Sequence, residues 1–298
     1  MTLSPVSAPA ADPSHVRTVP SRTLSPGSAL GPDRHVLRFL GGGERYEAYV
    51  AWDEPRFAPV VAKVLRPHLF DDARARAALE REASALDRIA HPAIVRSFGS
   101  ALEGPHPHLV LEFLDGPRLS TLIRRFGPLA VEQLVPLARQ LASALAYMNG
   151  QGWVHLDVKP RNIIMTGTPK LIDLSIARPI DDARRLSAPI GTDAYMAPEQ
   201  CAPDRRGQIG PTTDVFGLAA TVYEALTGRA AFPRTAEDRF PQLRPGRPVI
   251  PGKAPPGLAE ILVRCMADDP ADRPTPAELF DLLEPLAGWA DRGIRRIR

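Results

Sequence analysis

The spacing of apolar and polar residues divides the chain into a β-rich first part and a helical second part. Strand-like stretches occur at 35–40, 44–52, 58–65, 94–99 and 108–114, and a run of glycines joins the first two. Apolar residues recur at helical spacing from Ala75 to Ile89, which predicts a helix over 71–90. The sequence before residue 112 therefore predicts a small sheet accompanied by one helix.

Beyond Gly116 the pattern is mainly helical. Apolar stripes predict helices over 131–149, 212–226 and 258–266, and glycines follow the first two. A further helix is predicted over 276–286, with Thr275 as its N-cap. A small β-rich lobe, a short connection and a larger helical lobe together predict an α+β fold with two lobes.

Composition separates the chain ends from this ordered part. Residues 1–33 are dense in Pro, Ser and Ala and poor in large apolar side chains, which predicts a disordered tail. The ordered part is expected to comprise a small lobe over 34–111, a hinge over 112–117 and a large lobe over 118–288. Basic residues gather in 289–298, and this end is interpreted as a solvated helix terminus.

The overall composition excludes several classes of function. With 44% hydrophobic and 24% charged residues, the chain of 298 residues is typical of a soluble globular protein. Its net charge of +3 is too small to indicate a nucleic-acid partner. Neither a secretory signal nor a membrane-length apolar run is present, so we expect a cytoplasmic protein without a membrane partner. Cys201 and Cys265 lack metal-ligand spacing and are expected to be reduced.

The chemistry concentrates in one segment, GWVHLDVKPRNIIMTGTPKLIDLSIA, over 152–177. It brings Asp157, Lys159, Asn162 and Asp173 into a short loop and hairpin. A carboxylate can orient an attacking hydroxyl, and a cation can offset the charge of a transferred phosphate. An amide and a second carboxylate can hold magnesium. These residue types in this order favour phosphoryl transfer.

The run His155-x-Asp157-x-Lys159-Pro160-x-Asn162, followed by Asp173, resembles the catalytic and metal-binding loops of bacterial, eukaryotic-like serine/threonine protein kinases. This resemblance implies the two-lobed protein kinase fold, and ATP and Mg²⁺ as cofactors, with Mn²⁺ as an alternative metal. It implies transfer of the ATP γ-phosphate to Ser or Thr of protein substrates. Asp157 would accept the hydroxyl proton, Lys159 would offset γ-phosphate charge, and Asn162 with Asp173 would hold the metal. Pro160 and Thr192 match the serine/threonine branch.

The resemblance also implies a nucleotide site formed largely by residues before the hinge. Lys63 would bind phosphates and pair with Glu82, while backbone groups of Glu112 and Leu114 would bind the adenine edge. The remaining implied nucleotide-binding residues are Leu40, Gly41, Gly43, Ala48, Val61 and Ile164, with Leu111 as the gatekeeper. Ala48 and Val61 exchange the side-chain sizes usual at these positions, and we interpret this as a volume-conserving swap above the adenine.

Further landmarks follow in the order expected of that family. Ala197-Pro198-Glu199 would close the activation segment, and Arg273 would form a buried pair with Glu199. Asp214 would anchor the backbone of the catalytic loop. These positions imply a platform for protein substrates.

Three residues depart from the family pattern. Tyr46 stands where the family usually has a third small residue in the glycine-rich turn. Leu156 replaces an arginine that, in much of the family, binds a phosphate on the activation loop. Ser175 replaces the glycine of the family's Asp-Phe-Gly motif. Without that arginine, activity should depend little on loop phosphorylation, for which Ser187 is the candidate hydroxyl. Ser175 should disfavour a flipped, inactive loop.

Two alternatives stay open. The departures allow a pseudokinase, which would bind nucleotide and act as a scaffold. A kinase of small molecules is the other alternative, although the Ala-Pro-Glu platform and its arginine favour protein substrates. The oligomeric state is not predicted. Hydroxyl residues of the tail are candidate autophosphorylation sites: Ser4, Ser7, Ser14, Thr18, Ser21, Thr23, Ser25 and Ser28.

Overall fold

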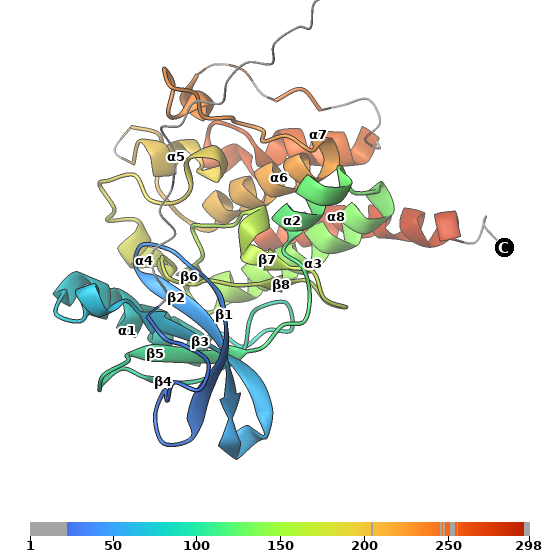
Figure 1. Ribbon diagram of the computed structural model, residues 1–298. Helices are drawn as coiled ribbons and strands as arrows, with labels where there is room; N and C mark the ends of the chain where they lie inside the picture. Colours follow the sequence, from blue (N-terminus) through green and yellow to red (C-terminus); the bar gives the residue numbers. More distant parts are fainter. Residues whose placement is uncertain are drawn as a thin grey trace, which may run out of the picture.

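A computed structural model describes residues 23–294, apart from 204, 245, 247, 251–253 and 255. The first lobe holds an antiparallel sheet in the order β1-β2-β3-β5-β4, and the second lobe is mainly helical (Figure 1). The strands are Arg34–Gly42 (β1), Tyr46–Asp53 (β2), Ala58–Leu65 (β3), Ser97–Ala101 (β4) and His108–Glu112 (β5). The predicted two-lobed α+β architecture is confirmed.

Helix α1, Ala73–Arg88, is the one α-helix that the structure describes before residue 112. Asp72 caps it by accepting a 2.8 Å hydrogen bond from the Ala75 N–H, which begins the helix two residues later than predicted. Its apolar stripe is buried in a cluster with the inner side of β5, including Leu79, Leu86 and Leu109. This packing fixes the position of Glu82, which lies on the same buried face.

The register of β2 and β3 separates the two faces of the sheet. Ala48 lies opposite Lys63, and Val50 lies opposite Val61, so Ala48, Val61 and Lys63 share one face. The other face carries a separate buried cluster that includes Tyr49, Val60 and Ala62. One face thus serves the candidate site, and the other forms a core of its own.

The N-terminal segment 23–33 packs on this second face, so the prediction of disorder is wrong for these residues. Leu24 and Leu30 are buried in the cluster with Tyr49. The Val36 N–H donates to the Ser28 carbonyl at 2.8 Å, and the Leu24 N–H donates to the Tyr49 hydroxyl at 3.1 Å. Two isolated leucines are a weak sequence signal, but they fill an otherwise open apolar surface. The rest of the predicted tail, 1–22, lies outside the described residues.

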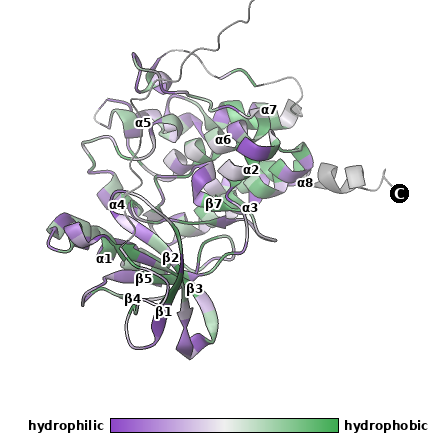
Figure 2. Ribbon diagram, in the orientation of Figure 1, coloured by the Kyte–Doolittle hydropathy of each residue, from purple (hydrophilic) through white to green (hydrophobic). Residues whose placement is uncertain are grey.

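The second lobe is built around the packed helices α3, α6 and α8, whose apolar residues form its core (Figure 2). Its helices are Leu119–Phe126 (α2), Val131–Gly150 (α3), Ile180–Ala183 (α4), Pro198–Cys201 (α5), Pro211–Thr227 (α6), Pro256–Cys265 (α7) and Pro276–Ile294 (α8). Short strands are Trp153–Val154 (β6), Ile163–Ile164 (β7), Lys170–Leu171 (β8) and Arg178–Pro179 (β9). Helices α2, α4 and α5 and these short strands were not predicted.

Two predicted elements have a boundary that differs by three residues or more in the structure. The strand predicted at 94–99 begins at Ser97, because the Val95 N–H instead donates to the Leu171 carbonyl of the second lobe at 2.9 Å. The helix predicted to end at 286 continues to Ile294, and residues 295–298 of the predicted basic end lie outside the described residues. Its start is confirmed: the Thr275 hydroxyl accepts from the Glu278 N–H, and the Glu278 carboxylate accepts from the Thr275 N–H.

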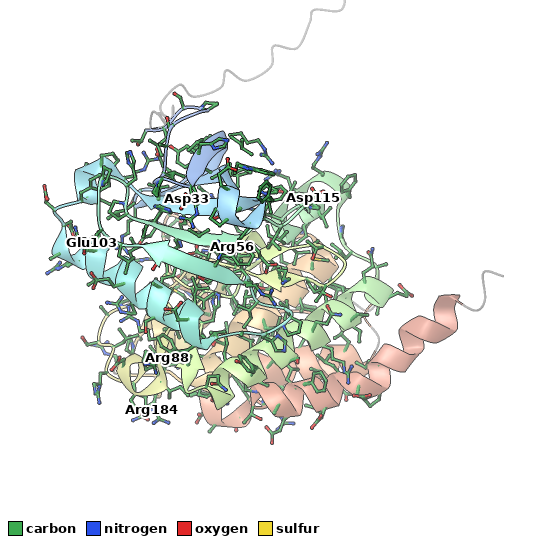
Figure 3. All side chains as sticks on the ribbon, turned by 90° about the horizontal axis from the view of Figure 1, so that it is seen from below. Asp33, Arg56, Arg88, Glu103, Asp115 and Arg184 are labelled. Carbon is green, nitrogen blue, oxygen red and sulfur yellow. The ribbon has the colours of Figure 1, made fainter. Side chains whose placement is uncertain are left out.

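Cys201 and Cys265 are both buried and unbonded to each other. No helix in the described part of the chain combines the length and apolar character needed to cross a membrane. Charged side chains such as Asp33, Arg56, Arg88, Glu103 and Arg184 lie on the exterior (Figure 3).

Candidate active site

The loop between β6 and β7 brings Asp157, Lys159 and Asn162 together. Lys159 Nζ lies 2.6 Å from Asp157 Oδ2, and Asn162 Nδ2 donates to the same oxygen at 3.0 Å. Thr192, far along the chain, donates to Asp157 Oδ1 at 2.7 Å and accepts from Lys159 Nζ at 2.6 Å. A single carboxylate is therefore oriented by three neighbouring side chains.

The backbone of this loop is held in a strained conformation. Leu156 has φ of 66°, a left-handed value that is costly for a residue with a branched side chain. Asp214 of α6 accepts 2.7 Å hydrogen bonds from the N–H groups of both His155 and Leu156. Gln200 donates to the Leu156 carbonyl at 2.9 Å. The predicted anchor Asp214 is thus in place, and these bonds offset the strain.

Burial has opposite consequences for the two titratable groups behind the loop. It raises the pKa of Asp214 to about 7, although the two backbone N–H donors act against this shift. Burial lowers the pKa of His155, whose Nδ1 accepts from the Asp157 N–H at 3.2 Å. A neutral imidazole suits that acceptor role.

Lys63 joins the two lobes through its ammonium group. Its Nζ lies 2.8 Å from Glu82 Oε1 of α1 and 2.7 Å from Asp173 Oδ1 of the second lobe. The predicted pair with Glu82 is present, whereas the direct contact with Asp173 was not predicted. Burial alone would lower the pKa of Lys63, but the two carboxylates raise it above its usual value. Burial likewise opposes ionisation of Asp173, and Lys63 outweighs it and lowers the pKa of Asp173.

The glycine-rich turn lies beside this ion pair. The Gly43 N–H donates to the Tyr46 carbonyl at 2.9 Å, and Arg66 Nε donates to the Gly43 carbonyl at 2.8 Å. Lys63 Nζ lies 4.7 Å from the centre of the Tyr46 ring, within cation–π range. The buried Tyr46 hydroxyl has no hydrogen-bond partner among the described residues. Tyr46 thus covers Lys63 on the side of the turn.

The expected adenine-binding residues occupy one region at the junction of the lobes. Ala48 and Val61 share the face of Lys63, Val61 lies opposite Leu111 of β5, and Ile164 lies in β7. In the described part of the chain the Leu114 N–H makes no hydrogen bond, which leaves it free for a ligand. The Glu112 N–H already donates to the Arg96 carbonyl. Of the Glu112 backbone groups, only the carbonyl therefore suits the predicted hydrogen bond to the adenine edge.

The glycine-rich turn and the hinge also depend on specific backbone positions. Leu40 on β1 is 42% exposed, and Gly41 adopts φ of 145°, a value that favours glycine. At Gly116 a Cβ would lie 2.3 Å from the Met165 carbonyl oxygen, so this position requires glycine. The hinge can therefore run directly against the end of β7.

Asn162 and Asp173 fit a divalent cation that binds through oxygen. Asn162 Nδ2 donates to Asp157, while Asn162 Oδ1 has no hydrogen-bond partner among the described residues and is available as a ligand. The Asp173 side chain is 36% exposed and its lowered pKa keeps it ionised. Among the described residues no group of three or more His, Cys, Asp or Glu is arranged to hold a metal ion. One carboxylate and one amide are typical of Mg²⁺ held jointly by protein, water and substrate phosphates.

The platform after the activation segment is fixed by a fully buried ion pair. Arg273 Nη1 and Nη2 lie 2.7 and 2.9 Å from the two carboxylate oxygens of Glu199. Thr213 also donates to Glu199, and the Arg273 guanidinium lies 5.0 Å from the Phe216 ring centre. The predicted bidentate pair is confirmed.

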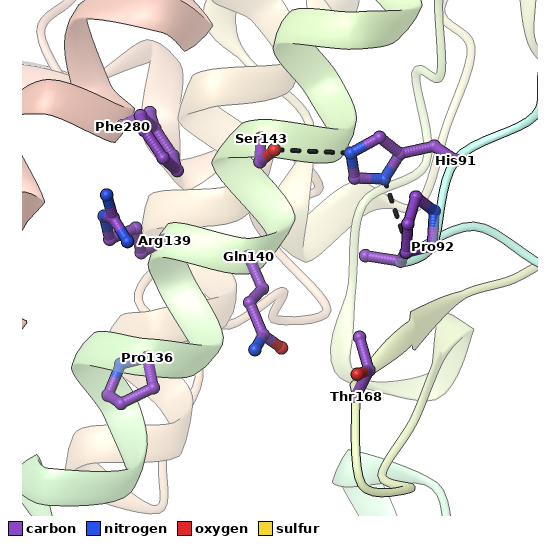
Figure 4. Close-up of a pocket in the computed structure, with 9 residues that line it drawn as sticks. His91, Pro92, Pro136, Arg139, Gln140, Ser143, Thr168 and Phe280 are labelled. Atoms are coloured by element: carbon purple, nitrogen blue, oxygen red, sulfur yellow. Dashed lines mark hydrogen bonds between the residues drawn. The ribbon is translucent and has the colours of Figure 1, made fainter.

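A surface pocket of about 390 Å³ lies where residues 91–93 of the first lobe meet the second lobe, away from the loop that carries Asp157 (Figure 4). Its lining contains none of the candidate catalytic or nucleotide-binding residues. Ser143 Oγ lies within hydrogen-bond distance of His91 Nε2, at 3.3 Å. Arg139 forms an ion pair with Glu284, and its guanidinium lies over the Phe280 ring. We interpret these contacts as structural.

Comparison with known proteins agrees with this geometry. The protein kinase domain model matches residues 34–282. The chain is 32% identical over 258 residues to serine/threonine-protein kinase PknD of Mycobacterium tuberculosis, covering 83% of this chain and 38% of that protein. It is 34% identical to the probable serine/threonine-protein kinase PkwA of Thermomonospora curvata, covering 86% of this chain and 35% of that protein. It is 36% identical to serine/threonine-protein kinase PkaA of Streptomyces coelicolor, covering 74% of this chain and 41% of that protein.

The chain thus spans less than half the length of these curated relatives. The family model nevertheless covers most of this chain and includes the residues assembled around Asp157 and Lys63. On these grounds, the chain belongs to the protein kinase domain family.

Proposed function

We propose that this protein transfers the γ-phosphoryl group of ATP to serine and threonine hydroxyls of protein substrates. The observation that carries this proposal is the orientation of Asp157 by Thr192, Lys159 and Asn162. The relatives named as serine/threonine kinases support the same reaction. The reaction is expected in the cytoplasm, where ATP is available.

Each residue has a role that its surroundings support. Asp157 accepts the proton of the substrate hydroxyl, and Lys159 beside it offsets negative charge on the transferred group. Lys63, oriented by Glu82, binds the phosphates of the nucleotide. Mg²⁺, or Mn²⁺ in its place, would bind to Asn162 and Asp173 and reduce the charge repulsion between phosphates.

We further propose that activity does not require phosphorylation of the activation segment. Leu156 is 3% exposed and is buried in a cluster with Val154, Ala183 and Ile209. Leu186 and Ile190 of the activation segment pack against that cluster. Apolar packing therefore anchors the segment where an arginine–phosphate pair would act in other kinases, and Ser187 nearby is exposed.

One observation favours the pseudokinase alternative. The Tyr46 ring lies over Lys63, which in the proposed mechanism binds the nucleotide phosphates. If the ring stays there when nucleotide binds, phosphate contacts are weakened. ATP binding without transfer would favour this alternative.

A magnesium-dependent assay with γ-labelled ATP tests the proposal. Wild-type protein and its Asp157→Asn variant are compared on protein acceptors and on a panel of small-molecule alcohols and aminoglycosides. We expect phosphoserine or phosphothreonine, mapped by mass spectrometry, with wild type alone. Equal transfer by the variant, or transfer to the small molecules alone, would contradict the proposal. Autophosphorylation of the serines and threonines in 1–28 is scored in the same spectra.

A further inference from the structure

Two arginines lie next to each other beside the catalytic loop. Arg161 belongs to the short turn Pro160–Asn162, between Lys159 and Asn162. Arg118 precedes α2, and its Nη1 donates to the Arg161 carbonyl at 3.3 Å. The Arg118 backbone forms an antiparallel bridge with Ile164, and the Met165 N–H donates to Pro117 at 2.8 Å. The hinge thus holds the Arg118 side chain close to the loop that carries Asp157.

Neither arginine has a carboxylate partner in the part of the chain that the structure describes. The neighbouring cations differ: Lys63 pairs with Glu82 and Asp173, and Lys159 pairs with Asp157. Both arginines are exposed, so an external group can reach them. Asp115, three residues before Arg118, is exposed on the surface (Figure 3).

The two cations also repel each other. Partial burial, followed by the charge of Arg161, lowers the pKa of Arg118 below its usual range. Holding like charges together without a counter-ion costs free energy that an anionic ligand would recover. The Asp193 carboxylate of the activation segment cannot fill this role, because Arg239 and Arg234 already bind it.

We propose that Arg118 and Arg161 select protein substrates that carry acidic side chains next to the phosphorylated serine or threonine. This inference rests on the proposed kinase function and specifies its substrate class. Guanidinium groups form bidentate hydrogen bonds with carboxylates, which gives direction as well as attraction. Arg161 is four residues from Asp157 in the same loop, so we expect the acidic residue to lie close to the acceptor in the substrate sequence.

A peptide series tests this inference by catalysis. Each peptide has one serine in a neutral background, with Glu, Lys or Ala placed in turn at each of the four positions on either side. We expect wild-type kcat/KM to be about tenfold higher for Glu than for Lys at one or two positions. The Arg118→Glu/Arg161→Glu double variant should lose or invert this preference, while its kcat/KM for the all-neutral peptide stays within about threefold.

Binding provides a second readout that does not require turnover. Fluorescence anisotropy of the labelled acidic peptide should show about tenfold weaker binding to the double variant than to wild type. The matched control is Arg124→Glu/Arg125→Glu, which makes the same charge change at exposed positions of α2, the helix that follows Arg118. If the control variant binds the acidic peptide about as tightly as wild type does, the loss in the double variant comes from Arg118 and Arg161 themselves. Equal weakening in both variants would show a general charge effect and overturn the inference.

The assay also separates substrate carboxylates from nucleotide phosphates as the bound anion. The double variant should bind ATP as tightly as wild type does. A loss of ATP affinity with an unchanged peptide preference would show that the two arginines bind nucleotide phosphates instead of substrate carboxylates, and would overturn the inference. If wild type phosphorylates the neutral peptide but shows no preference for Glu over Lys, the inference is rejected while the proposed kinase function stands. Absence of all transfer would reject the proposed function, and the anisotropy result would still decide the inference.

Discussion

Thr192 of the activation segment donates a 2.7 Å hydrogen bond to Asp157 of the catalytic loop. Gly191, just before it, has φ of 130°, and a Cβ there would lie 2.8 Å from Met196 Cγ. This glycine lets the segment turn closely enough for Thr192 to reach both Asp157 and Lys159. The position of the activation segment and the orientation of the Asp157 carboxylate are therefore linked.

Replacing Thr192 by Val should disrupt this link with little change in volume. We expect kcat for phosphoryl transfer to fall by about ten- to a hundredfold, because Asp157 and Lys159 lose a shared partner. Thr192→Ser, which keeps the hydroxyl, should retain most of the activity. Steady-state kinetics at saturating ATP measures both variants, and equal rates for Val and Ser would show that the hydrogen bond is dispensable.

Ser187→Ala should leave kcat within about twofold of wild type, since apolar packing anchors the segment. Leu156→Ala should instead lower the free energy of unfolding by about 2–5 kcal/mol, because it opens a cavity in that cluster. Kinetics and urea denaturation are measured on both variants. A large loss of activity in Ser187→Ala would mean that phosphate at this site is needed after all.

Ala48→Phe should block nucleotide binding. Ala48 shares a face with Val61 and Lys63, so a large ring there overfills the space expected for adenine. We expect ATP affinity to fall by at least about tenfold, measured by calorimetry, with thermal stability of the free protein close to wild type. Adding Val61→Ala should restore part of the affinity. Undiminished ATP affinity in Ala48→Phe would contradict the proposed adenine position.

Arg273→Ala should destabilise the second lobe strongly. Both partners of the Arg273–Glu199 pair have fully buried side chains, and removing one leaves an unpaired buried charge. The expected loss is about 3–5 kcal/mol in the free energy of unfolding. Arg264→Ala is the comparison, since Arg264 lies exposed on α7 and, among the described residues, its side chain makes only a 3.4 Å hydrogen bond to the Asp272 carbonyl. Similar losses in the two variants would refute the special role of the buried pair.

Acid should destabilise the fold through its buried histidines. Burial lowers the pKa of His108 from 6.5, and its Nε2 has no partner among the described residues. The unfolded chain therefore binds a proton that the folded chain excludes. This stability is present above about pH 6.5 and is lost as the pH falls, by at most about 1.4 kcal/mol per pH unit per histidine.

His108→Gln should reduce that slope in urea denaturation between pH 7 and pH 5. It should not remove the slope, because burial also lowers the pKa values of His91 and His155. A slope identical to that of wild type would show that His108 titrates normally in the folded protein.

The grouping of the candidate catalytic residues was predictable because each lies in a short contiguous motif with a chemical reason for its spacing. Asp157, Lys159 and Asn162 are within one loop, and the pair Lys63–Glu82 joins a strand to the helix that follows it. The core helices were predictable from apolar periodicity, with ends that moved by a few residues.

Relationships between distant segments were not predictable. The burial of Leu24 and Leu30 depends on an apolar sheet face that exists only once β2 and β3 pair. The contact between Arg118 and Arg161 depends on the hinge running against β7. The Tyr46 ring over Lys63 follows from the register of the same strands. None of these has a local pattern in the sequence.

The most direct test of the account is the progress curve of phosphatase-treated protein on a serine peptide with ATP and magnesium. A kinase whose activation segment is held by apolar packing should show its full rate from the first time point, with Asp157→Asn inactive throughout. Mass spectrometry at the first time point should find Ser187 unmodified. A lag that disappears after preincubation with ATP would contradict the central claim, because it would show that autophosphorylation must first build the active site.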